Sequence, residues 1–181
     1  FRVLAWNTLG MHCMDGDFSL FSLLPPFNSI GVQVVRDVAL VTDPAGLTVT
    51  YRAVADPSGS INSSSAGKTN YGDYVGDLYG AVLPVDAGLA GNDMPGAANT
   101  PQPIGFDAAS SSWIAEGIPI TPRDDAGNQN PSPLIRVEVR DAATQAVLGS
   151  VDTVLPVSDE MDCRAVHASG AGPAARPAAG W

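Results

Sequence analysis

The amino-acid sequence predicts an all-β fold, an immunoglobulin-like antiparallel sandwich with long irregular loops and at most one or two short helices. Two observations carry this prediction. The 181 residues include 19 glycines and 15 prolines, which interrupt helices and favour short strands joined by turns. In several short segments apolar side chains alternate with polar ones, as in strands that are buried on one face only.

The first half of the chain contains three segments with strand character. Residues 1–6 are expected to form the first strand. Residues 32–40 and 47–55 both approach period-two alternation, and the turn sequence Thr42-Asp-Pro-Ala-Gly46 separates them. The sequence therefore predicts that these two segments pair as a β-hairpin.

The second half contains a short strand at 112–116 and a second predicted hairpin, formed by residues 134–140 and 146–157. Between the halves, residues 71–79 are expected to form one or two helical turns, and residues 83–102 an irregular loop. The side chains of the two hairpins that are expected to be mostly buried are Val34, Val49, Tyr51, Val137, Val139 and Val154.

The length of the chain suits one domain with a substantial core. We expect residues 1–167 to form this single domain and the Ala-, Gly- and Pro-rich residues 168–181 to be a truncated tail or linker. The chain begins at Phe1 and not at Met, which is expected of a mature protein whose signal peptide has been removed, or of an excised piece. The expected location is therefore secreted, periplasmic or cell-surface.

The charge of the chain excludes some classes of partner. The formal net charge is −10, and no window of five residues holds more than two Lys or Arg residues. Nucleic acids and anionic lipid surfaces need a basic patch, so neither is expected to bind. No apolar run approaches the roughly 20 residues that cross a bilayer. Protein partners or self-assembly are expected instead.

The two cysteines and two histidines lie in two short segments, Met11-His-Cys-Met14 and Cys163-Arg-Ala-Val-His167. Two cysteines in an exported domain most often form a disulfide. Two thiolates and two imidazoles are also a suitable ligand set for zinc or copper. Adjacent residues of an extended chain point in opposite directions, so His12 and Cys13 can share one metal ion only in a tight turn. The residues of this candidate metal site are His12, Cys13, Cys163 and His167.

The segment Cys163-Arg-Ala-Val-His167 resembles the c-type haem attachment motif Cys-x-x-Cys-His, with Val166 in place of the second cysteine. Five further segments resemble parts of exported bacterial c-type cytochrome-related proteins of uncharacterised function, and the resemblance spans most of the chain. These segments are Asn7-x-x-Gly-Met-His-Cys-x-Asp-Gly-Asp17, the apolar stretch that ends in Leu24-Pro-Pro-Phe27, Ala115-Glu-Gly-Ile-Pro119, Asp124-Asp-Ala-Gly127 and Leu155-Pro-Val-Ser-Asp-Glu-Met161.

The resemblance implies haem iron bound by His167, with a thioether from Cys163 as the covalent tether. Because Val166 removes one of the two thiols that normally attach the haem, we expect no covalent haem in this chain.

The sequence favours a domain that is not itself an enzyme. It contains no Gly-x-Ser-x-Gly nucleophile elbow. We expect an extracytoplasmic structural or assembly domain of a cytochrome-related surface or electron-transfer protein. The alternative is a redox or metal-binding module for haem, copper or zinc, which would use His12 and Cys13 together with Cys163 and His167.

Overall fold

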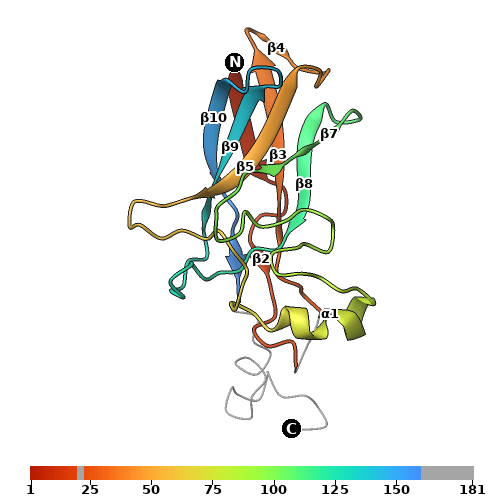
Figure 1. The fold of residues 1–181 in the computed structure, drawn as a ribbon, viewed down its shortest axis with the longest axis vertical. Helices are drawn as coiled ribbons and strands as arrows, with labels where there is room; N and C mark the ends of the chain where they lie inside the picture. The colour runs from red at the N-terminus through yellow and green to blue at the C-terminus, as the bar shows by residue number, and fades with distance from the viewer. Residues whose placement is uncertain (20–22, 160–181) are drawn as a thin grey trace, which may run out of the picture.

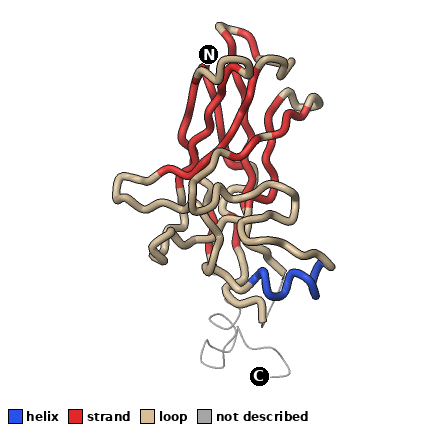
Figure 2. Tube along the Cα trace, viewed as in Figure 1, coloured by secondary structure: helices blue, strands red, loops and turns tan. Residues whose placement is uncertain are grey.

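The computed structural model describes residues 1–19 and 23–159. Its long strands form two antiparallel sheets at one end of the molecule, whereas loops and one short helix fill the other end (Figures 1 and 2). The prediction of an all-β sandwich with long irregular loops is therefore confirmed.

The first sheet has the strand order β1-β3-β8-β7. The short strand β4 follows β3 after a tight turn and pairs with Val35 and Arg36 at the end of β3. All of its pairs are antiparallel. Its central strand β3 is buried over most of its length. The strands are β1 (Arg2–Asn7), β3 (Asn28–Arg36), β4 (Ala39–Leu40), β7 (Gly105–Asp107) and β8 (Ser112–Ile118).

The second sheet has the strand order β10-β9-β5-β6, again with antiparallel pairs throughout. Strands β9 and β10 form the second hairpin that the sequence predicts. The strands are β5 (Leu47–Val54), β6 (Gln102–Pro103), β9 (Leu134–Asp141) and β10 (Val147–Val154).

The first predicted hairpin, residues 32–40 with 47–55, is wrong. Strand β3 pairs with β1, β4 and β8, while β5 pairs with β9 and β6. The predicted turn does form, with the Leu47 amide donating to the Pro44 carbonyl at 3.0 Å. This turn carries the chain from one sheet to the other, because alternation specifies which face of a strand is buried and not which strand lies beside it.

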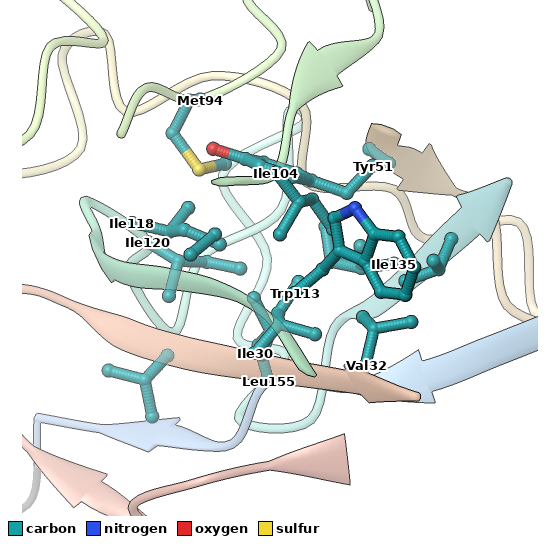
Figure 3. Close-up of a cluster of buried hydrophobic side chains, with 14 of the residues drawn as sticks. Ile30, Val32, Tyr51, Met94, Ile104, Trp113, Ile118, Ile120, Ile135 and Leu155 are labelled. Atoms are coloured by element: carbon teal, nitrogen blue, oxygen red, sulfur yellow. The ribbon is translucent and has the colours of Figure 1, made fainter. Parts of the chain in front are cut away.

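The core lies between the two sheets and continues toward the loop end (Figure 3). Val32 and Trp113 reach it from the first sheet, and Tyr51 and Ile135 from the second. The Tyr51 hydroxyl, close to Met94 in Figure 3, donates to the Asp93 carbonyl and so satisfies the only polar atom of that side chain.

Five of the six side chains predicted to be buried are buried, namely Val34, Val49, Tyr51, Val137 and Val139. Val154 is not, because 38% of its surface is exposed. It lies on β10, the edge strand of the second sheet, on the face that also carries the exposed Ser150 and Asp152.

The loop end holds the predicted helix, α1 (Tyr71–Tyr79), which ends at Gly80 in the left-handed conformation (φ 65°). The predicted irregular stretch from residue 83 runs without a strand until β6 begins at Gln102. The two short strands β2 (His12–Cys13) and β11 (Val157–Ser158) complete the described elements. No helix within the described ranges has the length and apolar character to cross a membrane.

The immunoglobulin-like part of the prediction stays a prediction, and the strand order supports it. When the seven strands β1, β3, β5, β7, β8, β9 and β10 are lettered A to G in chain order, the sheets read A-B-E-D and G-F-C. Immunoglobulin constant-type domains have these two sheets. Strands β2, β4, β6 and β11 would then be additions to that pattern.

The two faces of the second hairpin should differ sharply in their tolerance to truncation. We expect Ile135→Ala to lower the free energy of unfolding by about 2–5 kcal/mol, because the fully buried side chain leaves a cavity. Val154→Ala, on the paired edge strand, should cost less than about 1 kcal/mol. Urea unfolding measures both values, and equal losses would contradict the placement of these strands.

Candidate functional site

Segments near the two ends of the described chain meet at the loop end of the sandwich. Strand β2 pairs in parallel with β11, so that His12 lies opposite Val157 and Cys13 opposite Ser158. The His12 amide donates to the Pro156 carbonyl at 3.1 Å, and the Met14 amide donates to the Ser158 carbonyl at 2.8 Å. The structure thus places two predicted site residues beside the stretch of chain that precedes Cys163.

The other two predicted site residues, Cys163 and His167, lie outside the described residues. Among the described residues Cys13 has no disulfide partner, and its side chain is half-buried. Within residues 1–19 and 23–159 no three His, Cys, Asp or Glu side chains gather as a metal site would require. The predictions of a disulfide, a metal site and a haem site therefore stay predictions.

The imidazole of His12 is held in a defined orientation. Its Nε2 atom lies 2.7 Å from the Pro25 carbonyl oxygen, and the ring centroids of His12 and Phe27 are 4.0 Å apart. A carbonyl oxygen can only accept, so Nε2 carries the proton and the lone pair of the neutral ring is on Nδ1. Metal-binding histidines commonly donate their second ring N–H to such a carbonyl.

A buried asparagine connects the two short strands. The Asn28 amide nitrogen donates to the Gly10 carbonyl at 3.2 Å and to the Pro156 carbonyl at 2.5 Å. These carbonyls come from the loop before β2 and from the residue before β11. Asn28 itself is fully buried, and a typical hydrogen bond contributes about 0.5–1.5 kcal/mol, so Asn28 stabilises this junction. Nothing in the local sequence singles out this residue.

The carboxylate of Asp15 stabilises the segment that follows β2. Asp15 is only 2% exposed, and its Oδ2 atom accepts from the amides of Leu23 and Leu24 at 2.7 and 2.8 Å. The Asp15 amide in turn donates to the Leu24 carbonyl. The acidic sequence after Cys13 therefore serves local hydrogen bonding, as aspartates in turns commonly do.

An apolar cavity of about 440 Å³ lies next to this corner. Pro25 and Phe27, which contact the His12 ring, form part of its wall together with Leu9, Leu89 and Pro119. Its volume is in the range of pockets that bind small molecules.

The same cavity is bounded by Tyr71, the first residue of α1. Burial, with a smaller contribution from Tyr79, raises the pKa of Tyr71 to about 12. Its buried hydroxyl has no hydrogen-bond partner among residues 1–19 and 23–159. The phenol is therefore neutral at physiological pH.

Comparison with known proteins adds nothing to this geometry: no family model, curated protein or solved structure matches the chain. The resemblance to exported c-type cytochrome-related proteins stays a prediction that depends on the quoted segments.

Proposed function

We propose that this chain is an extracytoplasmic structural domain of a cytochrome-related electron-transfer or surface protein. In this proposal, the loop end of the sandwich supports the Cys163–His167 segment beside His12 and Cys13. The observation that carries it is the parallel pairing of β2 with β11. A sandwich needs no such pairing to close its core, whereas a domain that anchors its C-terminal segment does.

Covalent geometry supports this arrangement. Paired strands lie about 4.8 Å apart, so the backbone of Ser158 is at that distance from Cys13. Five further residues span at most about 18 Å when fully extended. A chain of this length is long enough to allow contact between Cys13 and Cys163, which the proposal requires.

A support role also agrees with the chemistry of the described residues. In the described part of the chain, the His12 ring forms its hydrogen bond with a backbone carbonyl. In a hydrolase triad the histidine would instead bond to a nucleophilic hydroxyl or thiol. The side chains of Asn28 and Asp15 form hydrogen bonds with backbone groups and so hold backbone segments in place. In this proposal, these polar side chains hold the backbone in position and take no part in a reaction.

A second candidate is a metal-binding or redox module for copper, zinc or haem. The orientation of His12 favours it, because Nδ1 is the ring nitrogen with the lone pair. The thiol of Cys13, with Cys163 and His167, would complete a two-sulfur, two-nitrogen set.

Absorption spectroscopy and metal analysis of the exported full chain separate the two candidates. For a structural domain we expect no Soret band, and no metal retained at one equivalent after incubation with Zn²⁺ or Cu²⁺ and gel filtration. One tightly bound ion per chain, lost in His12→Ala but kept in the neighbouring control Thr8→Ala, would contradict the first proposal and establish the second.

A further inference from the structure

The only lysine of the chain is buried against an asparagine side chain. Lys68 Nζ lies 2.8 Å from Asn62 Oδ1 and 2.8 Å from Asp125 Oδ1. The Lys68 side chain is 9% exposed, although lysines are rarely buried. Lys68 and Asn62 belong to the loop between β5 and α1, and Asp125 to the loop between β8 and β9.

The amide of Asn62 is fixed with its oxygen toward the lysine. Asn62 is 1% exposed, and its nitrogen donates to the Thr121 carbonyl at 2.7 Å. Since a C=O bond is about 1.2 Å long, Lys68 Nζ is within about 4 Å of the carbonyl carbon of Asn62. A near-attack geometry has about 3–3.5 Å between the reacting atoms, so a small movement of the amine would reach it.

The carboxylate of Asp125 is positioned to exchange a proton with the lysine. It also accepts from the Ser63 amide at 3.0 Å and from the Ser63 hydroxyl at 2.7 Å. Burial raises the pKa of Asp125, but the hydrogen bonds from Lys68 and Ser63 outweigh this and leave the pKa below its ordinary value. Asp125 is therefore ionised at neutral pH, and its Oδ1 atom, 2.8 Å from Lys68 Nζ, is within reach of the ammonium protons.

We propose that Lys68 and Asn62 become joined by an intramolecular isopeptide bond, with Asp125 as the proton carrier. Asp125 takes one proton from the Lys68 ammonium, and the neutral amine attacks the side-chain carbonyl carbon of Asn62. The new Nζ–Cγ bond forms, and the Cγ–Nδ2 bond breaks after Asp125 has passed a proton to Nδ2. Ammonia leaves with the remaining proton as ammonium, so the step needs no oxidant, reductant or other reactant.

The fixed position of the buried Asn62 amide favours this reaction. The hydrogen bond from Asn62 to Thr121 holds the amide in place during the attack. The product would close the loop between residues 62 and 68 covalently and fix the polar residues 60–65, which hold the two loops together.

Intact mass of the purified full chain tests the proposal. We expect a mass about 17 Da below the mass calculated from the sequence, the loss of one ammonia. Reductive methylation of the denatured chain should modify one primary amine, the N-terminal one, because Lys68 is the only other. A chain with the full calculated mass and two reactive amines overturns the proposal and leaves a buried ion pair.

Variants separate this bond from other losses of ammonia. Lys68→Arg retains the positive charge but cannot form the bond, so it should restore the calculated mass, as should Asn62→Ala. Asp125→Ala should slow or abolish the mass loss. A deficit that persists in Lys68→Arg would show a succinimide at an asparagine and contradict the proposal. The amine count on the unsubstituted chain decides the question even if a variant fails to fold.

Discussion

Val166→Cys should convert the chain into a covalent haem protein when it is exported in a host with the c-type maturation machinery. The substitution completes Cys-x-x-Cys-His over residues 163–167, so two thiols can add to the two haem vinyl groups. The adjacent His167 then becomes the axial ligand. The expected result is a Soret band, and haem staining that survives denaturation, in the variant and not in the unsubstituted chain.

Val166→Ser is the matched control for this substitution, because it has the size of cysteine without the thiol. Cys163→Ser in the Val166→Cys background should also lose most covalent attachment. Covalent haem in the unsubstituted chain would show that our prediction for this chain is wrong. Absence of haem from Val166→Cys would contradict the resemblance itself and leave a disulfide as the simplest account of Cys13 and Cys163.

The sequence predicts correctly the parts of the fold that depend on local interactions. The hairpin of β9 and β10 is one of these, because its turn is stabilised within itself: the Asp141 carboxylate accepts from the amides of Ala143 and Thr144. The alternation of Val137 and Val139 with charged residues shows which face is buried. Helix α1 and the irregular stretch after it are likewise visible in the sequence.

Pairings between distant segments are not visible in the same way. Strand β5 alternates clearly, yet nothing in residues 47–54 indicates that β9 and not β3 lies beside it. Strands β2 and β11 have two residues each, too few for any pattern. Their pairing depends on Asn28, whose amide reaches two carbonyls from distant parts of the chain.

The candidate site shows the same division. The rarity of cysteine and histidine was enough to select His12 and Cys13, and the structure places them at the junction of β2 and β11. The single lysine is equally visible in the sequence, but the reaction that we propose for it needs the carboxylate of Asp125, which is 57 residues away along the chain. Only the structure brings that carboxylate to Lys68.

A bridge between Cys13 and Cys163 should make a large contribution to stability. In the chain-entropy model, closing a loop of about 150 residues stabilises the fold by about 4–5 kcal/mol, less any strain. This is a large fraction of the 5–15 kcal/mol typical of a domain. We expect Cys13→Ser to lower the free energy of unfolding by that amount in the air-oxidised protein, as measured by urea unfolding.

The two cysteines give an internal control for this prediction. Cys163→Ser should lose as much stability as Cys13→Ser, and the double variant should lose no more than either single one, because all three remove the same bridge. Under reducing conditions the differences should largely disappear. Two reactive thiols in the native, air-exposed chain would contradict the bridge, which requires Cα atoms within about 7 Å of each other.

The bridge and the haem compete for the same sulfur atom. When Val166→Cys is matured with haem, Cys163 becomes a thioether and can no longer pair with Cys13. The half-buried thiol of Cys13 should then react with a thiol reagent once the chain is denatured, without prior reduction. In the unsubstituted oxidised chain the same reagent should find no thiol until a reductant is added. A haem-loaded variant in which Cys13 stays unreactive would show that Cys13 has another covalent partner.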